Sequence, residues 1–165
     1  NDVALGEAGI VGRGHGLAGE APQPDDGHVS SLRAGLLALP HDLDAVMVVL
    51  ADQPLIDAQA IDALIQAFVS RPVGTQMLQP TVQELPGNPV VFSSEVATQI
   101  LAEDGQMGAR QWQKAHPDEL YRWKTPDARY RLDVDNEQDR QTVETLTGQS
   151  LLWPSDLSRS HTKQT

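Results

Sequence analysis

The sequence predicts an α/β fold in which helices cover a mostly parallel sheet. Two observations carry this prediction: a continuous apolar run at residues 45–50, and apolar residues at helical spacing from Ile61 to Phe68 directly after it. A continuous, partly β-branched run is typical of a central strand that is buried on both faces of a parallel sheet. Short strands and helices alternate further along the chain, which favours a single α/β layer structure.

The first half of the chain is expected to hold a loop, a helix, the strand and a second helix. Residues 1–29 are dense in glycine and proline, which interrupt regular elements, so we interpret them as loop. Leucines at helical spacing predict a short helix over residues 30–39, with a serine pair able to cap it. The second helix follows Pro54, and Asp57 stands at its N-cap position.

The second half is predicted to continue the alternation. Strands are expected at residues 76–80, 90–92, 120–123 and 130–134. Helices are expected at residues 94–102, 108–116 and 136–146. We therefore divide the chain into a poorly structured segment at residues 1–26, one domain at 27–147 and a polar tail at 148–165.

Composition excludes several functional classes. The 12 basic residues against 23 acidic ones give a net charge of −11, which repels phosphate backbones, so nucleic acid is not expected as a partner. The absence of cysteine removes thiolate catalysis, cysteine-based zinc sites and disulfides. No apolar run approaches the roughly 18 residues that a membrane helix needs, and no secretory signal is visible. We expect a soluble, cytoplasmic protein without membrane partners.

Asp52 is the first candidate for a functional residue. It follows the predicted strand at residues 45–50 almost immediately, and Pro54 forces the chain out of that strand. Ligands of open α/β sheets bind beyond the carboxyl ends of the strands, where a carboxylate can hold a hard cation. The alternative is a turn aspartate that caps a backbone amide.

Asp133 and Asp135 form a second acidic strand end. Alternation along the predicted strand at residues 130–134 sends both side chains to the same side. Mg²⁺ usually takes one or two carboxylates together with substrate phosphates and water, so Asp52 with Asp133 would suffice. Asp135 is the less certain ligand, since an aspartate just before a helix is commonly its N-cap.

Residues 27–35 are a further candidate. They place free amides and the hydroxyls of Ser30 and Ser31 at an expected helix start, where an anion or the edge of a base can bind. Simple helix capping is the alternative interpretation of this segment.

Five segments, taken in order, resemble the molybdenum-cofactor cytidylyltransferases of the MobA-like NTP transferase family. Residues 27–35 resemble the family string G-x-x-S-S-L-x-x-G, and residues 49–55 resemble L-x-D-Q-P-L. Residues 80–92 are similar to P-x followed by G-N/H-P-V-x-F. Residues 104–110 are similar to G-D-x-G-A-R with one extra residue, and residues 132–139 to D-I-D-T-P-E-D with Asn136 and Gln138 departing from it.

The resemblance implies a Rossmann-like nucleotidyltransferase fold of the nucleotide-diphospho-sugar transferase type, a three-layer sandwich. It also implies Mg²⁺ dependence and transfer of CMP, or another nucleoside monophosphate, from an NTP to a molybdopterin-like acceptor with release of pyrophosphate. Carried over by position, the catalytic and metal-binding residues would be Asp52 and Asp133, with Asp135 as a further metal ligand. The nucleotide would lie at Ser30, Ser31, Leu32 and Asp52, and the acceptor side would hold Asn88 and Arg110.

One departure keeps other functions open. Residues 1–29 do not match the family string L-A-A-G-x-S-x-R-x-G-x-x-K, which holds the triphosphate, so the expected fold is incomplete at its N-terminus. A sheet without its first strand exposes an edge that a partner protein could cover. The alternatives are a degenerate domain that binds a nucleotide or a partner without turnover, and a relative acting on a different acceptor.

Overall fold

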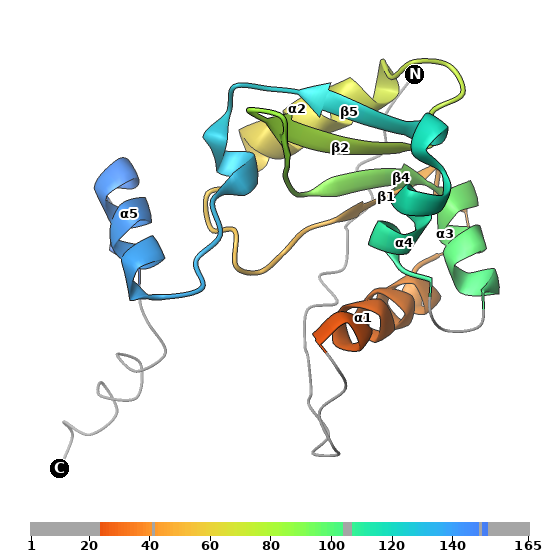
Figure 1. Cartoon of the computed structure of the whole chain (residues 1–165), viewed down its shortest axis with the longest axis horizontal. Coiled ribbons are helices and arrows are strands. Elements are labelled where there is room, and N and C mark those ends of the chain that lie inside the picture. Colours follow the sequence, from red (N-terminus) through yellow and green to blue (C-terminus); the bar gives the residue numbers. More distant parts are fainter. Residues whose placement is uncertain (1–23, 41, 104–106, 149, 152–165) are drawn as a thin grey trace, which may run out of the picture.

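The computed structural model describes residues 24–40, 42–103, 107–148 and 150–151 (Figure 1). The helices are α1 (Pro24–Ala38), α2 (Ala58–Val69), α3 (Ser94–Ala102), α4 (Ala109–Ala115) and α5 (Glu137–Thr147), with short 3₁₀ helices η1 (Pro117–Glu119) and η2 (Ala128–Arg131). The strands are β1 (Ala45–Val48), β2 (Met77–Val82), β3 (Leu85–Pro86), β4 (Val90–Ser93) and β5 (Leu120–Lys124). Residues 1–23 of the loop predicted at residues 1–29, and residues 149 and 152–165 of the tail predicted at residues 148–165, lie outside the described part.

The five strands form one sheet in which β1, β4 and β2 are successive neighbours, and β2 also pairs with β3 and β5. β4 is antiparallel to both β1 and β2, whereas β5 is parallel to β2. Strands β1, β2 and β5 therefore run in the same direction. The predicted α/β class is confirmed, but the sheet is mixed, because the chain returns from β2 to β4 through a hairpin connection that is too short for a parallel crossover.

Two apolar clusters lie on opposite faces of the sheet and make three layers. One cluster joins α1, α3 and α4 to the sheet, and it contains Met77, Val90 and Phe92. The other joins α2 and Tyr130 to the sheet, and it contains Leu78 and Val91. Neighbouring residues of β2 and β4 thus serve opposite faces, and helices cover both sides (Figure 1). The expected three-layer sandwich follows from this double burial.

The apolar run at residues 45–50 is not the fully buried strand that its sequence predicts. The strand ends at Val48, its residues are all partly exposed, and Val49 is 49% exposed. The buried strand is β4, every residue of which is buried. The reason is topological: among the described strands, β1 pairs only with β4, so its other edge has no neighbour in that part of the chain.

Helix α1 begins earlier than predicted. It starts at Pro24, inside the segment interpreted as loop, and Ser30 and Ser31 lie within the helix rather than at its cap. Proline is well tolerated in a first turn, where its missing N–H would have no intrahelical partner. The idea that free backbone amides at these serines bind an anion is therefore wrong, although both side chains are exposed.

The strand predicted at residues 130–134 is also wrong. Asp127 instead caps the 3₁₀ helix η2 by accepting a hydrogen bond from the Arg129 amide. This turn directs the Tyr130 side chain into the apolar cluster beneath α2. Residues 132–136 then run on without joining the sheet.

The N-cap predicted for the helix after Pro54 is confirmed, whereas the serine cap predicted for the first helix is not. Asp57 is the N-cap of α2 and accepts a hydrogen bond from the Ala60 amide at 2.9 Å. Asn136 caps α5 and forms a capping box with Asp139. Asp135 is therefore not the N-cap of the last helix, which removes the structural alternative considered for it.

None of the helices in the described ranges has the length and apolar character that crossing a bilayer demands.

The hairpin between β2 and β3 has a strained tip. Val82 pairs with Leu85, which leaves a two-residue turn of Gln83 and Glu84 with φ values of 53° and 64°. Two-residue turns with positive φ at both positions favour the sequence Asn-Gly, because most residues with a Cβ adopt positive φ only at an energetic cost. Among the described residues, Glu84 forms an exposed ion pair with Lys124, and pairs of that kind contribute little to stability.

We expect Glu84→Gly to raise the free energy of unfolding by about 1 kcal/mol relative to Glu84→Ala. Both variants remove the ion pair with Lys124, so the comparison isolates the backbone strain at position 84. Urea denaturation of the two variants measures the difference. Equal stability of the glycine and alanine variants would show that the turn is unstrained.

Candidate functional site

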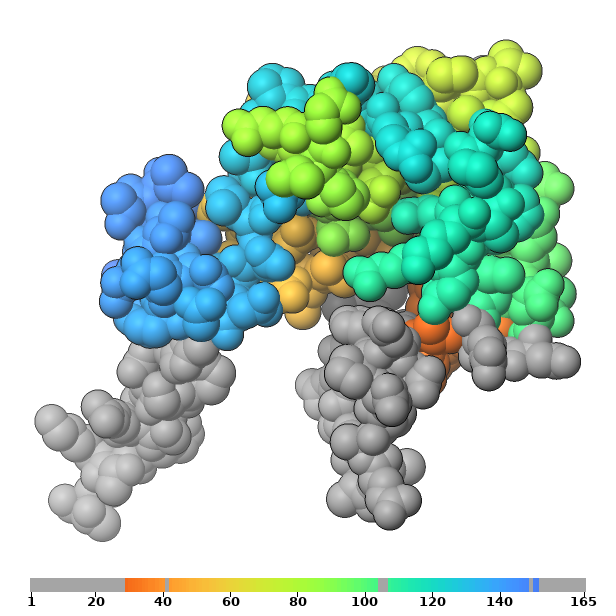
Figure 2. Space-filling model, in the orientation of Figure 1, coloured from red at the N-terminus to blue at the C-terminus, as the bar shows by residue number. Residues whose placement is uncertain are grey.

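Four of the residues predicted for the site lie at one edge of the sheet. Because β1, β2 and β5 share a direction, their carboxyl ends meet at the same edge (Figure 1). Asp52 follows β1, Asn88 lies between β3 and β4, and Asp133 and Asp135 follow η2. On the surface, the loop after β1 and the segment after η2 lie side by side (Figure 2).

A backbone hydrogen bond joins the two acidic segments directly. The Val134 amide donates to the Asp52 carbonyl at 2.8 Å, so Asp133 and Asp135 flank the residue that is bonded to Asp52. All three aspartates are exposed. Within the described ranges, no hydrogen bond reaches the Asp52 carboxylate, in contrast to the capping Asp57. The turn-capping alternative for Asp52 therefore has no support in this part of the chain.

The donor set fits a hard divalent cation. Within residues 24–40, 42–103, 107–148 and 150–151, no group of three or more His, Cys, Asp or Glu side chains is arranged to hold a metal on its own. Mg²⁺ does not require such a cage, because it commonly takes one or two carboxylates and completes its shell with phosphate oxygens and water. Exposed carboxylates on adjoining segments meet that smaller requirement.

Tyr130 is a buried residue that contacts several of the segments at this edge of the sheet. Its side chain is 1% exposed, its hydroxyl donates to the Ala60 carbonyl at 2.8 Å, and its ring meets Trp123 edge-on. Its backbone carbonyl accepts from the Asn88 amide at 2.8 Å and from the Gln53 side-chain amide at 3.4 Å. Burial raises the pKa of the Tyr130 hydroxyl, so it remains a neutral donor at physiological pH.

Gly87 allows the hairpin to approach Tyr130. A Cβ added at Gly87 would lie 2.5 Å from the Tyr130 carbonyl oxygen, a distance that real side chains do not tolerate. The Gly87 amide also donates to the Pro80 carbonyl at 2.8 Å. The glycine of the Gly87-Asn88-Pro89 string is therefore required sterically, and it puts Asn88 beside Tyr130.

An ion-pair cluster fastens α2 to η2 at the same edge. The Arg129 guanidinium donates to both carboxylate oxygens of Asp127, at 2.8–3.1 Å, and to Asp57 at 2.8 Å. The hydrogen bonds from Arg129 hold the pKa of the Asp127 carboxyl below its usual range. The carboxylates of Asp57 and Asp127 thus stabilise the fold through these contacts, which distinguishes them from the carboxylates of Asp52 and its neighbours.

Ser30 and Arg110 belong to a second group, formed by α1 and α4. Gly108, the N-cap of α4, packs so closely on α1 that a Cβ there would lie 2.9 Å from a methyl group of Val29. Ser30, Ser31 and Arg110 have exposed side chains, while Leu32 packs against the core. Arg33 anchors α1 by donating to the carbonyls of Ile100 and Leu101 at the end of α3.

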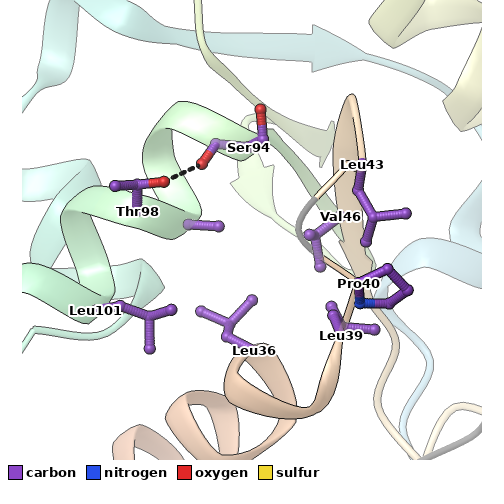
Figure 3. A pocket seen from close by; sticks show the side chains of 9 residues that line it. Leu36, Leu39, Pro40, Leu43, Val46, Ser94, Thr98 and Leu101 are labelled. Atoms are coloured by element: carbon purple, nitrogen blue, oxygen red, sulfur yellow. Dashed lines mark hydrogen bonds between the residues drawn. The ribbon is translucent and has the colours of Figure 1, made fainter.

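An apolar pocket opens elsewhere, between α1, β1 and α3 (Figure 3). It is lined mainly by aliphatic side chains, including Leu36, Leu43 and Leu101. Its polar residues are Ser94 and Thr98, and the Thr98 hydroxyl already donates to the Ser94 carbonyl at 2.9 Å. With no ionisable group in its lining, this pocket does not provide the chemistry of the carboxylate edge.

Sequence reasoning missed the residues that organise the edge. The sequence predicts a strand at Tyr130, it places Gly87 in a turn between two strands, and it gives Gln53 no role beyond its place in the string at residues 49–55. The one available signal was the glycine directly before Asn88, since a glycine beside a candidate polar residue often marks close backbone approach.

Comparisons with known proteins identify similar sequences and folds. The family profile described as MobA-like NTP transferase domain matches residues 17–120. No curated protein is significantly similar to the chain. Among solved structures, Rv0371c from Mycobacterium tuberculosis H37Rv is similar with a TM-score of 0.55 and 20% identity, over 70% of this chain and 58% of that one.

Two further structures share the fold at low sequence identity. The Rv0371c homolog from Mycobacterium sp. strain JC1 has a TM-score of 0.54 and 23% identity, over 71% of this chain and 57% of that one. A cytidylyltransferase from Leptospira borgpetersenii serovar Hardjo-bovis (strain JB197) has a TM-score of 0.54 and 14% identity, over 82% of this chain and 62% of that one. The chain therefore spans less than two thirds of each of these structures.

We expect Gly87→Ala to lower the free energy of unfolding by about 1–3 kcal/mol, the usual cost of forcing extra volume into a packed site. The added methyl group meets backbone, the Tyr130 carbonyl, rather than a flexible side chain. Thermal or urea denaturation measures the loss. Gly35→Ala is the matched control, because a Cβ at that helical position meets nothing within 4 Å and alanine favours the helix.

The Asp127–Arg129 pair should make stability depend on pH in the acid range. Because the folded-state pKa of Asp127 is lowered, its contribution is fully present above the unfolded pKa of about 3.9 and is lost as pH falls through the folded value. We expect Asp127→Asn, which can retain the cap, to be less stable than the wild type at neutral pH. The stability difference should shrink on acidification in a urea denaturation series, and a difference independent of pH would refute the charge pairing.

Proposed function

Because the chain belongs to the MobA-like NTP transferase family, we propose that it transfers CMP, or another nucleoside monophosphate, from an NTP to a small molybdopterin-like acceptor with release of pyrophosphate. The observation that carries the site assignment is the 2.8 Å hydrogen bond between the Val134 amide and the Asp52 carbonyl. It holds the segments bearing Asp52, Asp133 and Asp135 together at the carboxyl edge of the sheet. The chain spans only part of its structural relatives, so the activity assigned here is that of the whole protein.

Nucleotidyl transfer suits this edge because the reaction asks little covalent help from the protein. Catalysis of phosphoryl-type transfer consists mainly of positioning and of neutralising charge. In the proposal, Asp52 and Asp133 hold Mg²⁺, with Asp135 as a further ligand. Bound there, Mg²⁺ would neutralise phosphate charge and orient the transferred group.

The electrostatics of the chain support a requirement for that cation. The net charge is −11, and the exposed aspartates at the edge would repel a bare triphosphate. Attraction between the edge and the nucleotide therefore needs a positive charge between them. We assign this role to the divalent ion and expect NTP binding to depend on it.

The remaining contacts are assigned to the two substrates. The exposed hydroxyls of Ser30 and Ser31, with Leu32 beside them, are proposed to contact the nucleotide. Asn88 and Arg110 are proposed for the acceptor side. The base preference for CTP draws support from the sequence strings and from the fold shared with a cytidylyltransferase.

We expect Asp52→Asn to lower Mg²⁺-dependent pyrophosphate release by about 100-fold or more, since losing a metal ligand removes several kcal/mol of charge stabilisation. The assay follows pyrophosphate formed from each NTP in the presence of molybdopterin, and CTP should be the best donor. Asp62→Asn is the control, because this exposed aspartate lies within α2 and on neither of the two segments that carry Asp52 and Asp133.

Two outcomes would contradict the proposal. Full activity of Asp52→Asn would show that the metal site lies elsewhere. Tight, metal-dependent CTP binding by calorimetry without release of pyrophosphate would instead identify a binding domain without turnover. Release that occurs only with another acceptor, such as a sugar phosphate, would retain the reaction and change its substrate.

A further inference from the structure

Gln53 carries a buried polar atom without a partner. The residue is 6% exposed, and no hydrogen bond reaches its side-chain oxygen Oε1 from the described residues. Its Nε2 donates to the Tyr130 carbonyl at 3.4 Å, a long hydrogen bond. Exchanging the two amide atoms would set oxygen against the Tyr130 carbonyl oxygen, so the amide orientation is determined by this contact.

Stability does not account for a glutamine at this position. A buried acceptor without a hydrogen bond costs about 1–3 kcal/mol, whereas a bond as long as that of Nε2 returns little. The Tyr130 carbonyl already accepts the Asn88 amide at 2.8 Å, so it does not depend on Gln53 for a partner. An apolar side chain of equal length would fill the same space without the cost at Oε1.

The location of Gln53 in the fold explains better than stability why a glutamine stands at this position. Gln53 directly follows Asp52 in the turn after β1, and its backbone amide donates to the Leu50 carbonyl at 3.4 Å within that turn. Its side chain reaches across to Tyr130, just before the segment that carries Asp133. It is thus a side-chain tie between the two acidic segments, next to the backbone bond from Val134 to Asp52.

We propose that Gln53 is a positioning residue, which fixes the turn bearing Asp52 against the segment bearing Asp133 so that their carboxylates can share one divalent ion. The consequence for catalysis rests on the proposed function above, whereas the connection that Gln53 makes between the two segments does not. Residues that do not bind the metal themselves but orient its ligands are commonly retained for function at the expense of stability.

The test compares the full chain with Gln53→Met, which keeps the length of the side chain and removes both amide atoms. We expect an unchanged or higher melting temperature, because the unpartnered oxygen is gone. Amide hydrogen exchange measured by NMR should become faster at Val134. Affinity for Mn²⁺ alone and the rate of pyrophosphate release should both fall about 10- to 100-fold, the usual effect of losing a residue that orients metal ligands.

Gln113→Met is the matched control. Gln113 is partly buried and also donates a side-chain hydrogen bond, to the Met77 sulfur at 3.3 Å, but on the α4 side of the sheet. This variant should leave exchange at Val134, Mn²⁺ affinity and pyrophosphate release unchanged.

Two results for Gln53→Met would overturn the proposal. Unchanged Mn²⁺ affinity would show that the tie does not position the carboxylates. A lower melting temperature with faster exchange throughout the described core would show an ordinary structural residue. If the whole wild-type protein releases no pyrophosphate, the proposed function fails, while exchange at Val134 still decides whether Gln53 holds the two segments together.

Discussion

The burial of Tyr130 is the constraint on which the carboxyl edge of the sheet depends. Its ring and hydroxyl fix it beneath α2, so its backbone carbonyl stands at one defined place. The hairpin reaches that carbonyl through Asn88, and the turn after β1 reaches it through Gln53. Only a glycine at position 87 permits this approach. Three stretches far apart in the sequence are therefore positioned by one buried residue.

The acidic residues at this edge fall into two kinds with different physical roles. Asp57 and Asp127 cap helices and pair with Arg129, and Asp139 completes the capping box of α5. These carboxylates have their interactions within the fold. Asp52, Asp133 and Asp135 remain exposed on segments joined by the bond from Val134 to Asp52. Exposed carboxylates on adjoining segments are the kind of ligand that a hard divalent ion takes.

A second anchor connects the other motif residues. Gly108 lies against Val29, and Arg33 fastens α1 to the end of α3. The serines of α1 and the arginine of α4 therefore belong to one group, on the face of the sheet that α1, α3 and α4 cover. Two of the strings that resemble the family thus make close contacts at a glycine: Gly87 lies against the Tyr130 carbonyl, and Gly108 lies against Val29.

The sequence alone determined the local features and the family. Asp57 and Asn136 begin helices because their short polar side chains satisfy free amides in the next turn, an effect that needs no distant partner. The ordered strings were sufficient for the family resemblance, which the match over residues 17–120 confirms. The tertiary structure alone decided which apolar run is buried and what residues 130–134 become. The spacing of apolar residues shows which faces of a strand or helix are apolar, but it does not show which elements lie beside it. The apolar run of β1 therefore predicts a central strand, although β4 is the buried strand. Tyr130 leaves the expected strand because Asp127 caps a local 3₁₀ turn, and because distant residues of α2 and the sheet surround a space that buries its ring.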